Sequence, residues 1–413
     1  MTFTRSLSNS ESQDQSKMQI QTTDDKIKRF LERKFRISRS YKTKATYMAS
    51  LKRFIEFVRI NYNLDLAQLV TQIKETKEID PIDVLDEYFS FLSEYQLCGK
   101  RRIGYSAVAI KNYLKVAKEF LNGEGCKIYN EDVKQRFKLP RTVQTFYRGL
   151  TKETINRLVR LANPKLAALI LIACSSGMRL GELVQLRLSD IDFSINPVTV
   201  TLRAQTTKTR QARITHISSE AKSAVNDYLA RQNTPKKNDD YLFLLQHKDR
   251  LDMNAENKRM DHWKKLQSQI ISMSEEEKFA KSVAATGHNL SQQLVRVIKD
   301  NPELNKKTEN GRNEIHFHAF RYFFKTQVTD AHESDFAEAL MGHKSLKLVY
   351  YRQNDKKRAE TYLKVEPALT IADTEKIDRD FVELQENNQD LRSVVEGLSR
   401  QLRNLENKIQ SNI

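Results

Sequence analysis

The stretch "AALILIACSSGMRLGELVQL", residues 167–186, opens as an unbroken apolar run and then turns polar around a glycine and an arginine. Such a run is typical of a helix that is buried on all sides, and we expect it to end at the glycine-containing turn. A turn fixed by a buried helix can hold the guanidinium of Arg179 beneath a cleft. An ion pair between Arg179 and Glu182 explains the same residues, so this stretch alone leaves both interpretations open.

A β-hairpin is predicted downstream of this stretch. Residues 197–204 ("PVTVTLRA") and 212–218 ("ARITHIS") carry alternating β-branched residues, and the polar turn that joins them is short. Lys208 lies at the tip of the predicted hairpin. Lysines at hairpin tips are usually solvated, so Lys208 alone does not indicate a function.

Two motifs that contain histidine follow toward the C-terminus. The first, "FHAFRYFF" (317–324), places His318 and Arg321 on one face of a helix among aromatic residues. Burying either polar side chain there is costly unless it is paired or used in a reaction. The second, "MGHKSLKLVYYRQ" (341–353), contains His343 and, further on, two adjacent tyrosines.

The order of these motifs is more informative than any one of them. An arginine, a hairpin lysine, His-x-x-Arg, Gly-His and a tyrosine follow one another behind a basic helical segment. In this order "GMRLGEL", "HAFRYFF" and "LMGHKS" closely resemble the three boxes of the tyrosine recombinase (phage integrase) family, over roughly residues 25–365. The ending "YYRQ…YLKVEPALTI" looks most like integrases of archaeal mobile elements.

The resemblance implies a C-shaped clamp, in which a helical core-binding domain and a mixed α/β catalytic domain lie on opposite faces of a DNA duplex. The expected fold is mainly α-helical, with a small antiparallel β-sheet in the catalytic domain and a C-terminal coiled coil. The expected function is site-specific recombination through a covalent 3′-phosphotyrosyl intermediate. The catalytic residues implied by the resemblance are Arg179, Lys208, His318, Arg321, His343 and Tyr351.

The chemistry of these side chains fits such a reaction. A tyrosine hydroxyl, with a pKa near ~10, needs help to attack a phosphodiester at neutral pH. Arg179 and Arg321 offer bidentate donors to the non-bridging oxygens. His318 can accept the tyrosine proton, His343 can donate to the phosphate, and Lys208 suits protonation of the 5′-oxygen. We therefore expect no metal ion and no nucleotide cofactor.

The choice of nucleophile lies between neighbouring tyrosines. Tyr350 and Tyr351 differ in direction by about 100° on a helix, so only one of them can face a given phosphate. Tyr351, eight positions after His343, is closer to the family's usual spacing than Tyr350. Tyr362 is a distant third candidate, available only if its segment acts as a flexible arm.

Composition and periodicity divide the chain into five segments. A charged, poorly periodic excursion is expected at about 252–313 within the fourth. The segments are a disordered N-terminus (1–23), a helical core-binding domain (24–125), a linker (126–150), a catalytic domain (151–370) and a coiled-coil tail (371–413).

The formal charge of +17 predicts a polyanionic partner, here double-stranded DNA. The most basic segment is a loop followed by a helix that we expect Ser106 to cap. On that helix Lys118 shares a face with two of the expected DNA contacts, opposite Val108, Leu114 and Phe120. The expected DNA-binding residues are Lys100, Arg101, Arg102, Lys111 and Lys115, although a solvated charged face is the plain alternative.

The tail has the pattern of a dimeric coiled coil. From Ile377 to Ile409 apolar residues recur in alternating steps of four and three, with Asn388 at one a position. Nine acidic and six basic residues make the segment 371–413 acidic overall. We therefore expect it to serve self-association, in a homodimer or a tetramer on paired DNA sites, with a helix folded back on the catalytic domain as the alternative.

Other features limit the setting. The longest apolar run, Leu166–Cys174, is far shorter than the roughly 20 residues of a membrane-spanning helix. The three cysteines are widely spaced and form no metal-binding pattern. We expect a cytoplasmic, DNA-associated (nucleoid) protein without membrane contact. A catalytically silent DNA-binding regulator and a type IB topoisomerase are the competing interpretations.

Overall fold

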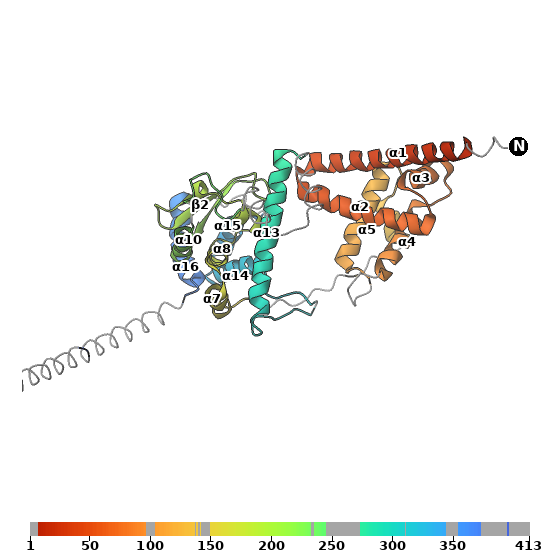
Figure 1. Ribbon diagram of the computed structural model, residues 1–413. Helices are drawn as coiled ribbons and strands as arrows, with labels where there is room; N and C mark the ends of the chain where they lie inside the picture. Colours follow the sequence, from red (N-terminus) through yellow and green to blue (C-terminus); the bar gives the residue numbers. More distant parts are fainter. Residues whose placement is uncertain are drawn as a thin grey trace, which may run out of the picture. The chain divides into compact units, whose positions relative to one another are not determined.

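Helices make up most of the described chain, and a small antiparallel sheet accompanies them (Figure 1). The computed structural model describes residues 7–95, 104–136, 149–232, 235–244, 273–309, 311–343 and 354–372, together with positions 138, 141 and 395. Two compact units result: unit 1 comprises Met1–Gln144 with Ser274–Ala280, and unit 2 comprises Thr145–Met273 with Lys281–Ile413. The predicted coiled coil lies outside the described residues.

All regular secondary structure in the described residues of unit 1 is helical. Phe54, Phe57 and Tyr88 lie at the centre of its core and are fully shielded from water. Ser106 caps the helix that follows the basic loop, as predicted, by accepting a hydrogen bond from the Ala109 N–H. The helices are α1 (Leu7–Ser38), α2 (Tyr41–Tyr62), α3 (Leu66–Thr71), α4 (Pro81–Glu94), α5 (Ala107–Gly123) and α6 (Asn130–Arg136), and a π-helical turn, Gln72–Thr76, follows α3.

The structure differs from the sequence-based expectations for unit 1 in three places. Helix α1 begins at Leu7, inside the segment 1–23 that was expected to be disordered. Helix α6 lies inside the expected irregular linker, where Arg136 pairs with Asp80 and Asp83 at 2.6 and 2.9 Å. Val108, expected on the apolar face of α5, is 51% exposed.

Unit 2 is built around the buried helix α8, whose side chains from Leu166 to Ser176 are nearly all buried. Around it pack α7, α10, α14, α16 and the strand β3 (Figure 1). The helices are α7 (Lys152–Leu161), α8 (Pro164–Ser176), α9 (Leu180–Val184), α10 (Ser219–Ala230), α13 (Glu275–Lys299, whose residues up to Ala280 belong to unit 1), α14 (Phe317–Asp330), α15 (Ser334–Met341) and α16 (Asp355–Leu369), with a 3₁₀ turn at Leu188–Asp190.

The predicted hairpin is confirmed. Strands β2 (Val198–Leu202) and β3 (Arg213–Ile217) pair antiparallel, with Val200 opposite Thr215. A short strand that the sequence did not reveal, β1 (Ile191–Asp192), adds to the other edge of β2. The sheet presents its buried residues to the side on which α8 lies, so β3 is held next to the end of that helix.

The charged span at 252–313, expected as an insertion or a long loop-helix excursion, contains a long regular helix. Residues 245–272 lie outside the described part, but α13 then runs for 25 residues. Its buried stripe recurs every four residues and consists of Ser282, Thr286, Leu290, Leu294 and Ile298. Because two members of this stripe are hydroxyl residues, the period is hidden in a search for apolar residues alone. Within the described residues, no helix is both long and apolar enough to cross a membrane.

Candidate active site

The turn that ends helix α8 begins the candidate site. Gly177 has φ 63°, the left-handed conformation that favours glycine, and its N–H donates to the Ala173 carbonyl at 3.1 Å. A Cβ atom here would lie 2.5 Å from the ring of Phe324, so both the conformation and the space require glycine. The chain then reaches Arg179, the residue that precedes α9.

A buried carboxylate binds Arg179. Glu182, only 2% exposed, accepts the Arg179 backbone N–H at 2.9 Å and its Nη1 at 3.1 Å. Arg213 on β3 donates to the same carboxylate with Nη1 and Nη2, at 3.1 and 2.7 Å. Burial alone would raise the pKa of Glu182, but Arg213 and then Arg179 hold it below its ordinary value. The ion pair that the sequence allowed for Arg179 is therefore present, and Arg213 shares it.

Arg321 connects two helix ends. It lies on α14, is 1% exposed, and donates Nη1 to the Gly177 carbonyl and Nη2 to the Met341 carbonyl, the latter at 2.8 Å. Burial, together with the charge of Arg179, lowers the pKa of Arg321 to about 9, so the guanidinium remains charged at neutral pH. Its Nε is buried without a hydrogen-bond partner.

His343 is held in a defined tautomer. Its Nε2 lies 2.9 Å from Arg321 Nη2, and because a guanidinium can only donate, Nε2 accepts. The proton therefore sits on Nδ1, which donates to Glu338 at 2.5 Å, and Lys325 pairs with the other carboxylate oxygen at 2.6 Å. The sequence analysis gave His343 the role of a donor to phosphate. In this arrangement Nε2 accepts instead, so donation requires a second ring proton or a turn of Arg321.

His318 lies at the surface in the first turn of α14, near the same arginine. Its ring contacts the ring of Tyr322 edge to face, with centroids 4.7 Å apart. Partial desolvation and the charges of Arg321 and its neighbours lower the pKa of His318 below its ordinary value. The imidazole is thus neutral at neutral pH, the state required to accept a proton.

The structure places Lys208 in the turn between β2 and β3, where the sequence predicted it, with its side chain exposed. The turn itself is braced by Thr207, whose buried hydroxyl bonds to the Gln211 N–H and carbonyl at 3.1 and 3.0 Å.

Tyr350 and Tyr351 lie outside the described residues. Tyr362, the third tyrosine considered, is fully buried on α16 and donates its hydroxyl to the Ser175 carbonyl at 2.9 Å. Burial raises its pKa well above the ordinary value. A hydroxyl placed in this way cannot reach a phosphate, and it instead fastens α16 to the end of α8.

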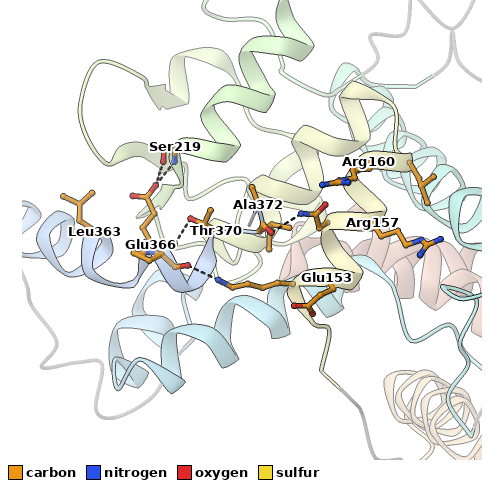
Figure 2. A pocket seen from close by; sticks show the side chains of 13 residues that line it. Glu153, Arg157, Arg160, Ser219, Leu363, Glu366, Thr370 and Ala372 are labelled. Atoms are coloured by element: carbon orange, nitrogen blue, oxygen red, sulfur yellow. Dashed lines mark hydrogen bonds between the residues drawn. The ribbon is translucent and has the colours of Figure 1, made fainter. Parts of the chain in front are cut away.

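The C-terminal end of α16 is fastened as well, beside a cavity of about 1100 Å³ that none of the candidate catalytic residues lines (Figure 2). Lys152 donates to the Pro367 carbonyl at 2.9 Å, and Glu366 accepts from the N–H and hydroxyl of Ser219, both at 2.7 Å. Glu220 accepts the two N–H groups of residues 371 and 372. Helix α16 is therefore fastened to α8 through Tyr362 and to α7 and α10 at its C-terminal end.

Of the expected DNA contacts, Lys100, Arg101 and Arg102 lie outside the described residues. Lys111 and Lys115 lie on α5, half-buried and exposed respectively, and Lys115 approaches Glu119 at 3.9 Å. Tyr95 and Gly104, which flank the basic loop in sequence, are joined by a hydrogen bond from the Gly104 N–H to the Tyr95 carbonyl at 2.9 Å.

Sequence reasoning missed two charged residues of the site, Arg213 and Glu338. A signal existed for Arg213, since an arginine on a short strand that faces a buried helix needs an acidic partner. Glu338 precedes His343 by five positions and resembles any exposed helical glutamate in the sequence. In the described part of the chain, no group of three or more His, Cys, Asp or Glu side chains is arranged to hold a metal ion.

A model of the phage integrase family matches residues 148–358, about half of the chain. Three crystal structures of similar proteins share 15–21% sequence identity with this chain. XerA recombinase has 20% identity and a TM-score of 0.33, covering 83% of this chain and 98% of that one. A lambda integrase(75-356) dimer bound to a COC′ core site has 15% identity and a TM-score of 0.48, and the match covers 79% of this chain and 98% of that one. XerH site-specific recombinase bound to palindromic difH substrate, in a post-cleavage complex, has 21% identity and a TM-score of 0.45, and the match covers 77% of this chain and 78% of that one. No curated protein sequence matches.

Proposed function

This chain belongs to the phage integrase family, and we propose that it cuts and rejoins DNA through a tyrosine that bonds covalently to the 3′-phosphate. As a member of that family it is a site-specific DNA recombinase. The observation that carries the proposed reaction is the buried guanidinium of Arg321, which is held by two carbonyls and a neutral imidazole rather than by a carboxylate. Such a cation keeps its charge for an anion from outside.

In the proposed reaction Tyr351 is the nucleophile. Its oxygen attacks the scissile phosphorus, the bond from phosphorus to the 5′-oxygen breaks, and the tyrosine proton passes to His318. Arg179 and Arg321 bind the non-bridging oxygens in the transition state, with His343 beside them. Lys208 protonates the departing 5′-oxygen from the exposed turn between β2 and β3. Attack by a 5′-hydroxyl of another strand reverses these steps, so no external energy source is needed.

A DNA substrate that traps the cleaved state tests this reaction. Tyr351→Phe is expected to abolish the covalent protein–DNA adduct while binding persists, because only the attacking hydroxyl is lost. Tyr350→Phe is the matched control and is expected to cleave. An adduct formed by Tyr351→Phe but not by Tyr350→Phe would move the nucleophile by one residue. Failure of the wild-type chain to form any adduct on its recombination site would favour the silent DNA-binding regulator.

We propose that the basic loop and helix α5 bind the duplex. The support is the charge of Lys100, Arg101 and Arg102 and the position of Lys111 and Lys115 on the helix that follows. Affinity should fall with salt by about 0.9 log units per neutralised phosphate for each log unit of salt. Triple replacement of residues 100–102 by alanine should weaken binding to all duplexes alike. Unchanged affinity would remove this assignment.

Self-association through the tail is the second part of the proposal. The heptads with Asn388 at an a position favour a parallel dimer, and a tetramer would form when two dimers meet on paired sites. The isolated segment 371–413 should sediment as a helical dimer that Asn388→Ile stabilises, and a monomeric peptide would contradict this. From the motif "YYRQ…YLKVEPALTI" we further propose kinship with integrases of archaeal mobile elements, and from the basic charge a location on the nucleoid. A topoisomerase of type IB would act without paired sites, which the same recombination assay distinguishes.

A further inference from the structure

Arg213 reaches three elements of unit 2 at once. It lies on β3, five positions after Lys208, and its side chain is 9% exposed. Two of its nitrogens bind the carboxylate of Glu182, which precedes the hairpin in sequence, while Nε donates to the Leu340 carbonyl at 2.7 Å. One side chain thus joins the start of α9, the hairpin and the end of α15.

The carboxylate of Glu182 is shared unequally. Arg213 gives it two side-chain hydrogen bonds, whereas Arg179 gives it one side-chain bond and a backbone N–H. A guanidinium has five N–H donors, so this division leaves most of those of Arg179 outside the ion pair. Arg179 also keeps 24% of its side chain exposed, against 2% for Glu182.

At the end of α15 the carbonyls of Leu340 and Met341 are bound by different arginines. Arg213 takes the first, and Arg321 takes the second. Gly342 follows with φ 66°, and a Cβ atom there would lie 2.9 Å from the Cδ of Arg213. The turn that leads to His343 therefore packs closely against the side chain of Arg213, with no room for a Cβ atom at position 342.

We propose that Arg213 is a positioning residue of the recombinase site. It neutralises Glu182, so that Arg179 is free to face the scissile phosphate, and it fixes the turn that carries His343. This inference rests on the roles proposed above for Arg179 and His343. A purely structural role would predict a loss of stability without a specific loss of cleavage.

Single-turnover cleavage of a trapping DNA substrate at saturating DNA, measured beside DNA affinity and the unfolding midpoint, tests the proposal. Arg213→Met should slow cleavage by about 100-fold, the cost of a small displacement of a catalytic group, with little change in affinity. Arg213→Lys keeps the charge but not the bidentate geometry, so its rate should lie between those of Arg213→Met and wild type.

Combining Arg213→Met with Glu182→Gln makes the test specific. Without its negative charge, residue 182 no longer draws Arg179 into a full ion pair, so the double variant should cleave about 10-fold faster than Arg213→Met alone. The double variant also lacks the buried carboxylate of Glu182 that Arg213→Met leaves without its main partner. It can therefore be measured even if Arg213→Met folds poorly.

Arg203→Met is the matched control. Arg203 pairs with Asp190 at 3.1 Å and donates to the Gln185 carbonyl at 2.9 Å, in the same region but with no candidate catalytic residue. It should cleave at the wild-type rate. Wild-type cleavage by Arg213→Met, or a double variant no faster than that single variant, would overturn the proposal. Normal cleavage by Arg179→Ala would instead overturn the assignment of Arg179, which separates the two failures.

Discussion

Two arginines, Arg53 in unit 1 and Arg321 in unit 2, show how differently the same side chain can be held. Arg53 pairs with Glu56, and its guanidinium lies 4.2 Å from the centre of the Tyr95 ring. Burial alone would lower its pKa, but Tyr105 and Glu56 raise it above the ordinary value. Arg321 is more deeply buried and has a lowered pKa, and its hydrogen bonds within the described residues go to uncharged groups.

The contrast teaches how to tell a structural cation from one that awaits a ligand. The charge of Arg53 is already balanced by a carboxylate and tyrosine rings, so the fold itself accounts for it. The charge of Arg321 is not balanced by direct contact with a carboxylate in the described residues. A buried cation of this kind is costly to the fold, which makes sense if an anion such as a DNA phosphate completes its surroundings.

The strongest test of this contrast is Arg321→Met. Loss of one preorganised donor at a developing negative charge typically costs about 100- to 1,000-fold in rate, and we expect at least that loss in adduct formation at saturating DNA. DNA affinity should change little, since most affinity comes from contacts to the phosphate backbone elsewhere. A near-normal cleavage rate would show that Arg321, like Arg53, is only structural.

A second test changes the turn beside Arg321 without removing the arginine. In Gly342→Ala the new methyl group meets the side chain of Arg213 in a backbone conformation that alanine adopts at a cost of about 1–2 kcal/mol. We expect cleavage to fall by about 10-fold or more through displaced catalytic groups. Gly311→Ala is the control, because Gly311 also has a positive φ but no atom lies within 4 Å of the place that the new methyl group would occupy. Equal cleavage rates in the two variants would argue against coupling through Arg213.

The third test uses pH. The lowered pKa of His318 shifts protonation of its imidazole below about pH 6.5, the ordinary value for histidine. If His318 accepts the tyrosine proton, cleavage should decline as the ring becomes protonated, with the half-point of the decline below about pH 6.5. His318→Gln should cleave more slowly and lack this decline. A rate that already halves near pH 7 would contradict the assignment.

The smallest expected effect on cleavage belongs to Arg53→Met. Removing its stacking on Tyr95 and Tyr105 should lower the free energy of unfolding by about 1 kcal/mol. Cleavage at saturating DNA should remain at the wild-type rate, measured as adduct formation beside a denaturant titration. A large catalytic loss would mean that unit 1 contributes to the reacting centre, and the comparison of the two arginines would fail.

The parts of the fold that could be predicted from the sequence depend on local patterns. The hairpin followed from β-branched alternation on both sides of a polar turn, and the buried helix α8 followed from its unbroken apolar run. The regular period of helix α13 was not recognised, because Ser282 and Thr286 occupy its buried stripe. Val108 was expected on the apolar face of α5 because valine is an apolar residue, but in the structure its side chain is exposed.

The candidate site was only partly accessible to the same reasoning. Arg179 and Arg321 stand in short, distinctive motifs. The bond from Arg213 to the Leu340 carbonyl joins residues 127 positions apart, and no local pattern encodes such a contact. The tautomer of His343 likewise depends on Glu338 and Arg321 together, which only the folded chain brings to the two sides of one ring.

The carbonyls that hold these arginines have an electrostatic consequence of their own. Gly177 ends α8, and Leu340 and Met341 end α15, so two helices direct their C-terminal ends at the guanidinium groups. Aligned peptide dipoles leave roughly half a negative elementary charge at such an end. This diffuse charge offsets part of the repulsion among Arg179, Arg213 and Arg321. Unlike a carboxylate it cannot be protonated or swing away, so the cluster keeps its shape, and its remaining positive charge, before DNA arrives.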